Sequence, residues 1–354
     1  MKHLFLCAAL LVVSPLAPMA YAQTEARDVE VDDVANAKAA YLEARYEKAM
    51  ELARPHAEQG NAEAQMLLGS LYTNGHGVTA DTDEGARWFS LAAAQGNADA
   101  QYLYGMLLEY GGVKGASSEK ARESFLAAAR QGHLPAQTEL GMMLAAGNGG
   151  PKDLASAADW FETAAAQGDA NAQYYLATLL ARGSGRPANQ AEAARLFTLS
   201  ADQGHEEANY RLGLMLQDGA GIEKDAVAAA RRFRAAAERG LPDAQASLGL
   251  AYLNGEGVER NDTFAAKWFA EAALRGNAQA QEHLARLFFL GQGVTRDITA
   301  ALLWHSLAER GGITDETLKN AMEPEITPEI RARVARQLEK LDAGRPSSPS
   351  TGAD

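Results

Sequence analysis

The sequence predicts an all-α fold, a right-handed α/α superhelical solenoid built from antiparallel helix pairs. Two sets of glycines lead to this prediction. One glycine recurs every 36 residues, at Gly60, Gly96, Gly132, Gly168, Gly204, Gly240, Gly276 and Gly312. Another recurs fifteen residues into each of the seven resulting repeats, at Gly75, Gly111, Gly147, Gly183, Gly219, Gly255 and Gly291. Because glycine marks turns, two turns in a repeat indicate two helices, and such pairs bury their apolar faces by stacking on neighbouring pairs.

The N-terminal residues 1–22 are predicted to be a cleavable signal peptide. Lys2 supplies a basic start, residues 4–13 form an apolar run, and Ala22 ends a small-x-small cleavage site. We expect cleavage between Ala22 and Gln23 and a periplasmic or secreted mature chain. The apolar run is shorter than the roughly 20 residues of a transmembrane helix, so we expect no stable membrane insertion. An uncleaved N-terminal membrane anchor is the alternative.

The mature chain is predicted to be acidic and to lack thiols. The only cysteine, Cys7, lies inside the apolar run and is removed with it. Removal of Lys2 changes the net charge from −13 to −14, because 32 of the 33 basic residues and all 46 acidic residues remain. An acidic surface repels phosphate backbones, so we expect no nucleic-acid partner and favour neutral or basic partners.

The first helix of each repeat is predicted from apolar residues at spacings of four, one and three. In the first repeat these are Ala64, Leu68, Gly69 and Tyr72, which share one face of a helix. The small residue beside the leucine is Gly69, Gly105, Gly141, Ala177, Gly213, Gly249 and Ala285 along the seven repeats. Because glycine costs about 1 kcal/mol against alanine inside a helix, its return predicts that a neighbouring helix passes too close for a larger side chain.

The second helix of each repeat is predicted to begin at a capping residue six positions after the second glycine. These residues are Asp81, Ser117, Asp153, Asn189, Asp225, Asn261 and Asp297. An aromatic residue follows at Phe89, Phe125, Phe161, Phe197, Phe233 and Phe269, whereas the last repeat has His305. The helix ends at the glycine that opens the next repeat.

The repeat pattern AQxxLGxxYxxGxGVxxDxxxAxxWFxxAAxQG resembles the Sel-one-like repeat, a relative of the tetratricopeptide repeat. The resemblance covers residues 60–311. Residues 23–59 resemble a tetratricopeptide-like N-terminal capping helix pair, and residues 312–342 resemble C-terminal capping helices, where Thr327 precedes a first-turn proline. Residues 343–354 have too little apolar content to fold and are predicted to be a disordered tail.

The resemblance implies an exported, non-enzymatic scaffold that binds a protein or peptide partner. Exported Sel-like proteins serve in envelope complexes, regulate membrane sensor kinases or contact host proteins. The alternative function is a cell-wall enzyme or a muropeptide or β-lactam binder, because Ser117 and Lys120 match S-x-x-K and a cysteine-rich branch of the family is associated with β-lactams. Ser117 occupies a capping position, however, and the partner motifs and the thiol pairs of that branch are missing. A third hypothesis is end-to-end oligomerisation, but polar closing helices predict a monomer.

No cofactor, metal site or catalytic group is predicted. The histidines of the mature chain lack the close helical spacing of a zinc site, and no predicted strand precedes the GxG runs, which excludes a phosphate-binding loop. All four tryptophans precede the aromatic position of their repeats, at Trp88, Trp160, Trp268 and Trp304. This spacing distributes them along the stack, so we expect core packing rather than a ligand box.

A partner-binding surface is predicted on the concave face of the first helices. Positions six and ten residues after each opening glycine lie opposite the buried direction and carry no charge in six repeats. Aromatic and methionine side chains are typical of contact sites, so the predicted binding residues are Tyr102, Met106, Met142, Tyr174, Tyr210 and Leu214. Only the seventh repeat, with Glu282 and Arg286, is expected to present a solvated face there. The alternative is that these side chains pack between adjacent repeats.

Overall fold

The structure is a computed structural model that describes residues 33–343, and within them it is entirely helical, without a strand. The prediction of an all-α solenoid of antiparallel helix pairs is confirmed. The predicted signal peptide, its cleavage between Ala22 and Gln23, and residues 344–354 of the predicted tail lie outside the described residues. The chain divides into two compact units, one ending at Gln167 and one starting at Gly168, which we describe separately.

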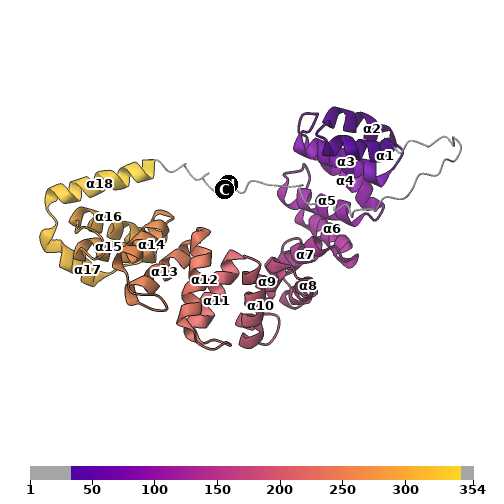
Figure 1. Cartoon of the computed structure of the whole chain (residues 1–354). Coiled ribbons are helices and arrows are strands. Elements are labelled where there is room, and N and C mark those ends of the chain that lie inside the picture. Colours follow the sequence, from indigo (N-terminus) through magenta and orange to yellow (C-terminus); the bar gives the residue numbers. More distant parts are fainter. Residues whose placement is uncertain (1–32, 344–354) are drawn as a thin grey trace, which may run out of the picture. The chain divides into compact units, whose positions relative to one another are not determined.

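Unit 1 stacks four helix pairs, in which each helix packs on the helix before it (Figure 1). Its helices are α1 (Asp33–Leu42), α2 (Tyr46–Glu58), α3 (Ala62–Asn74), α4 (Thr82–Ala94), α5 (Ala98–Tyr110), α6 (Ser118–Arg130), α7 (Leu134–Ala146) and α8 (Leu154–Ala166). The first pair precedes the repeats, and α3 to α8 are the helix pairs of repeats one to three. The first helices of these repeats are therefore α3, α5 and α7.

Unit 2 stacks the pairs of repeats four to seven and ends in three closing helical elements. Its helices are α9 (Ala170–Arg182), α10 (Gln190–Asp202), α11 (Glu206–Asp218), α12 (Ala226–Glu238), α13 (Pro242–Asn254), α14 (Asp262–Leu274), α15 (Ala278–Leu290), α16 (Ile298–Arg310), α17 (Glu316–Met322), the 3-10 helix η1 (Glu323–Glu325) and α18 (Pro328–Ala343). Leu318 and Met322 of α17 are buried against Ala285 and Ala301 of the last repeat. Thr327 Oγ1 accepts a hydrogen bond from the Ile330 amide at 3.3 Å and caps α18 as predicted.

The predicted capping residues begin all seven second helices. Each side chain accepts a hydrogen bond from an amide in the first turn. Asp81 Oδ1, for example, accepts from the Glu84 amide at 3.0 Å. Ser117 Oγ accepts from the Lys120 amide at 3.3 Å, so the serine of the S-x-x-K motif is the N-cap of α6.

The small residue of the first helix faces the aromatic residue of the second helix in the same repeat. A Cβ added at Gly69 would lie 2.7 Å from the Phe89 ring, and one added at Gly141 would lie 2.5 Å from the Phe161 ring. The six phenylalanines at this position are 0–2% exposed. The prediction of a close neighbouring helix is therefore confirmed, and the neighbour is the partner helix of the pair.

Tryptophan packing differs among the repeats. Trp88 is 3% exposed and belongs to the core cluster around α1 to α3. Trp304 is half-buried and packs against the apolar clusters of the last two repeats. Trp160 and Trp268 are also half-buried. The core role predicted for tryptophan is thus confirmed at Trp88 and Trp304.

Buried glutamines tie consecutive helices together. Gln137 of α7 donates from Nε2 to the Ala129 carbonyl of α6 at 3.3 Å, and its Oε1 accepts from Gln167 Nε2, at the end of α8, at 2.9 Å. Gln65 and Gln101 make the same pair of bonds in the first two repeats. Each glutamine therefore fixes its own helix against the helix before it and the helix after it.

Candidate functional site

The candidate site is the first-helix face, by which we mean the surface at positions six and ten residues after each opening glycine. In unit 1 it lies on α3, α5 and α7, and in unit 2 on α9, α11, α13 and α15. All six predicted binding residues are half-buried. Tyr102, Met106 and Met142 belong to unit 1, whereas Tyr174, Tyr210 and Leu214 belong to unit 2. Their role in binding a partner stays a prediction.

The tyrosines of this face are held against neighbouring rings. The ring centroid of Tyr102 lies 5.9 Å from that of Phe125 and 4.7 Å from that of His133. Tyr174, in unit 2, makes the two corresponding contacts: its ring centroid lies 5.8 Å from that of Phe197 and 4.5 Å from that of His205. One side of each ring thus packs within and between repeats while part of the side chain stays accessible. Each ring is therefore fixed in orientation before any partner binds.

His133 and His205 are helix caps, a role that the sequence reasoning missed. Their Nδ1 atoms each accept a hydrogen bond at 3.2 Å, from the Ala136 and Ala208 amides that begin α7 and α11. Asn61, Asn97, Asp169 and Asn277 cap the first helices of other repeats from the same position. That shared position is the sequence signal that identifies the two histidines as caps. Burial lowers the pKa of both histidines, so the neutral capping form is favoured.

Acid is expected to weaken these two caps. Because the folded-state pKa values are lowered, the stabilisation is fully present above about pH 6.5 and is lost as the pH falls through the lowered values. Protonation of Nδ1 removes the acceptor and places a positive charge at a helix N-terminus.

The His133→Asn, His205→Asn double variant is expected to lose less stability than the natural protein between about pH 7.5 and about pH 5. Each cap contributes about 1 kcal/mol. Denaturant unfolding at both pH values measures the difference, and a double variant with unchanged acid sensitivity would contradict the assignment of the caps.

The expectation of a solvated face in the seventh repeat is wrong for Glu282. This side chain is 7% exposed, and its Oε2 lies 2.9 Å from Nδ1 of His305, which is 1% exposed. The sequence separation equals that of Tyr102 and Phe125, so a buried ion pair replaces a pair of rings. The hydrogen bond to Glu282 raises the pKa of His305. Arg286 is exposed, as expected, and forms an ion pair with Asp315.

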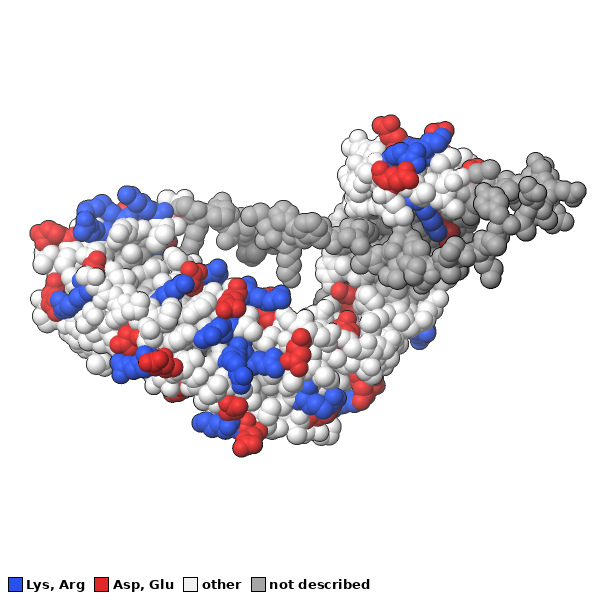
Figure 2. Space-filling view, in the orientation of Figure 1, with Lys and Arg blue, Asp and Glu red and all other residues white. Residues whose placement is uncertain are grey.

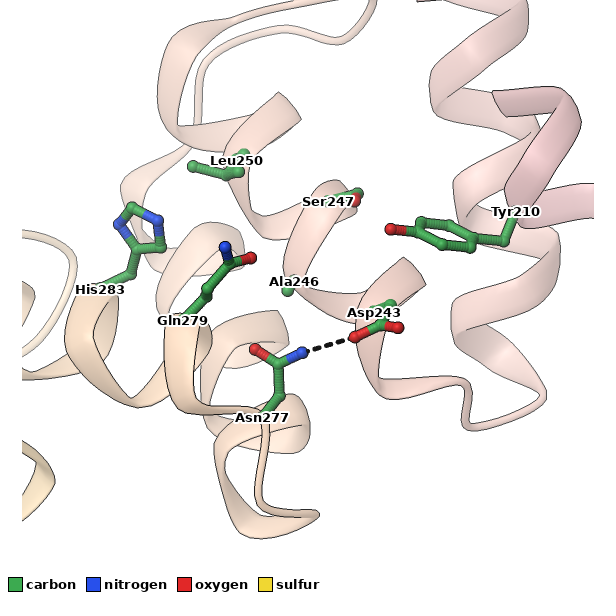
Figure 3. A pocket seen from close by; sticks show the side chains of 8 residues that line it. All are labelled: Tyr210, Asp243, Ala246, Ser247, Leu250, Asn277, Gln279 and His283. Atoms are coloured by element: carbon green, nitrogen blue, oxygen red, sulfur yellow. Dashed lines mark hydrogen bonds between the residues drawn. The ribbon is translucent and has the colours of Figure 1, made fainter. Parts of the chain in front are cut away.

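A small recess interrupts the first-helix face of unit 2 at Ala246 of α13 (Figure 3). Most repeats carry a larger side chain in this position, such as Tyr174 in α9 or Tyr210 in α11. The recess has a volume of about 40 Å³, far below the roughly 300 Å³ of a pocket for a drug-sized ligand. It is therefore large enough for one functional group of a partner.

Charge on the described surface is mixed in sign. Figure 2 shows lysine and arginine side chains interspersed with aspartate and glutamate side chains on the face drawn. Within residues 33–343, no helix is long and apolar enough to cross a membrane. In the same range, no three His, Cys, Asp or Glu side chains are grouped as metal ligands.

A family model described as Sel1 repeat matches seven consecutive segments of the chain. They are residues 62–97, 98–133, 134–169, 170–205, 206–241, 242–277 and 278–313. These matches span more than half of the 354 residues. No curated protein matches the chain.

Two similar solved structures are repeat proteins. A Sel1 repeat protein from Oxalobacter formigenes is 32% identical, with a TM-score of 0.66, over 82% of this chain and 87% of that one. The protein c5321, a protective antigen of uropathogenic Escherichia coli strains with an SLR fold, is 25% identical. Its TM-score is 0.58, over 87% of this chain and 77% of that one.

Proposed function

The chain belongs to the Sel1 repeat family, and from this premise we propose that it is an exported, non-enzymatic scaffold that binds a protein or peptide on its first-helix face. Sel1 repeat proteins typically mediate protein–protein interactions, and the repeat scaffold is typically non-catalytic. Fold alone does not identify a partner, so the proposal depends on the chemistry of this surface.

The proposal is supported by half-buried aromatic, methionine and leucine side chains on the first-helix face of each unit, at Tyr102 and Met106 in unit 1 and at Tyr174 and Leu214 in unit 2. Rings that are already fixed by Phe and His neighbours lose little conformational freedom when a partner binds. Large side chains that are cheap to desolvate supply most of the binding energy at protein interfaces. The face therefore offers preorganised apolar contacts that a partner can cover.

Export is supported by the signal-like residues 1–22. The similar Escherichia coli protein is described as a protective antigen. An envelope extract is therefore the source in which a partner should be sought. The net charge, −13 for the full sequence and −14 without residues 1–22, favours partners that are neutral or basic.

Affinity capture from an envelope extract tests the proposal. The Met106→Arg, Leu214→Arg variant is expected to retain the fold, because Arg286 occupies the same position in the seventh repeat. Its capture of the partner is expected to fall about tenfold or more, since two apolar contacts become charged.

The matched control is Leu91→Arg, Leu199→Arg, which adds the same charge to second helices of the two units at side chains that are each 39% exposed. The control is expected to capture as the natural protein does. Equal capture by all three proteins, each with unchanged helical circular dichroism, would refute the first-helix face as the binding surface.

A further inference from the structure

The recess at Ala246 has a polar wall and an apolar floor. Six polar side chains surround it, from α11, α13, α15 and the N-cap of α15: Tyr210, Asp243, Ser247, Asn277, Gln279 and His283. The floor is the methyl group of Ala246, which is 5% exposed, together with Leu250. Figure 3 shows the Tyr210 hydroxyl directed toward Ser247 and the Gln279 amide extended toward Ala246. Hydroxyl, amide and carboxylate groups therefore line a recess with a small apolar base.

The charge of the recess is negative. Asp243 is the only acidic side chain among the residues that line it, and none of them is a lysine or an arginine. Burial and Arg286 lower the pKa of His283, which favours its neutral form. Arg286 itself is paired with Asp315. An anion would be repelled by Asp243, whereas a cation gains a charged acceptor.

Asp243 is fixed in position. Its Oδ1 accepts a hydrogen bond from Asn277 Nδ2 at 2.8 Å (Figure 3). Asn277 Oδ1 in turn accepts a hydrogen bond from the Ala280 amide at 2.8 Å. The carboxylate is thus held by the N-cap of α15 rather than left to swing into solvent. A group that binds it therefore meets an oriented acceptor.

We propose that this recess binds a primary ammonium group, the end of a lysine side chain on the partner. The inference rests on the proposed scaffold function and adds the chemistry that the partner presents. An ammonium group carries three donors, which match the carboxylate of Asp243 and the hydroxyl and amide oxygens around it. The volume of about 40 Å³ suits this compact head, and the lysine stem lies along Ala246 and Leu250.

The test is a titration of the full chain with Nα-acetyl-lysine methylamide, followed by amide NMR shifts of Ala246 and Ser247. Affinity on the order of millimolar is expected for one such group. The norleucine analogue, which lacks the ammonium group, is expected to bind about tenfold more weakly. Equal binding of the two probes would overturn the proposal.

Variants separate the recess from other surfaces. Asp243→Asn is expected to weaken lysine binding about tenfold, and Ala246→Met to abolish it by filling the recess with a side chain like Met66, in the same position of the first repeat. Glu207→Gln removes an equal charge one repeat earlier and is expected to leave binding unchanged.

Lysine binding that survives Ala246→Met would overturn the site. The scaffold function is tested by a separate experiment, because partner capture by the Met106→Arg, Leu214→Arg variant is measured independently of the lysine titration. The recess could bind the lysine probe while the Met106→Arg, Leu214→Arg variant captures the partner as the natural protein does. This result would refute partner binding on the wider first-helix face and would support the lysine site in the recess.

Discussion

The Glu282→Ala variant is expected to lose about 3 kcal/mol of unfolding free energy. Glu282 and His305 are 7% and 1% exposed, so the substitution leaves a buried imidazole without its 2.9 Å partner. Removing one member of a buried pair costs more than the pair itself contributes, because the remaining polar group stays desolvated. Denaturant unfolding, together with hydrogen exchange of α15 and α16, measures the loss where it occurs.

The double variant Glu282→Tyr, His305→Phe is the control. It restores the ring pair that Tyr102 and Phe125 form in the second repeat. Volume and polarity then match the other repeats, so its stability is expected to return to within about 1 kcal/mol of the natural protein. A loss of less than about 1 kcal/mol in the Glu282→Ala variant would show that the Glu282–His305 pair does not stabilise the last repeat.

The pair also gives a pH dependence opposite to that of the capping histidines. The pKa of His305 is raised in the folded state, so its contribution to stability is fully present below about pH 6.5 and is lost as the pH rises through the raised value. The contributions of His133 and His205 to stability are instead lost as the pH falls, because their folded-state pKa values are lowered. The natural protein therefore combines two opposing titrations, and Glu282→Ala is expected to remove the alkaline loss.

The Gly257→Ala variant is expected to lose about 3 kcal/mol. Gly257 has a φ of +70°, and a Cβ there would overlap the backbone carbonyl of Ala226, at the start of the preceding second helix. Because the obstacle is backbone rather than a flexible side chain, the loop between α13 and α14 must move away from the preceding repeat. Thermal and denaturant unfolding measure the effect.

Gly276→Ala is the matched control for this substitution. Its φ is +87°, but a Cβ there would meet nothing within 4 Å. The control therefore carries only the conformational cost, about 1 kcal/mol. Equal losses in the two variants would show that the close approach at Gly257 contributes nothing to repeat stacking.

The sequence was sufficient to predict the architecture, because the same physical requirement recurs in every repeat. A cap such as Asp81 must accept from first-turn amides, and Gly69 must be small where the Phe89 ring packs. The glutamines recur in the same repeat pattern, but the pattern does not predict their hydrogen bonds. A bond such as that from Gln167 to Gln137 depends on the packing of two helices that are 30 residues apart in sequence.

The candidate site could be predicted only in part. The residues of the face follow from helical spacing, but their exposure depends on side chains contributed by the next repeat, as at Tyr102 and His133. Glu282 was predicted to be exposed because its hydrogen-bond partner, His305, lies in another helix and cannot be identified from the spacing within one helix. The recess likewise depends on the combination of a small Ala246 with neighbours from three helices, which no single repeat specifies.

Site-specific photo-crosslinking distinguishes partner binding on the first-helix face from binding on the second helices. A photoreactive phenylalanine analogue is placed at Met106 or Leu214 on first helices, and at Leu91 or Leu199 on second helices, in the full chain produced in intact cells. A crosslinked partner is expected from the first-helix positions and none from the second-helix positions. Crosslinks formed only from Leu91 and Leu199 would show that the partner does not bind the first-helix face.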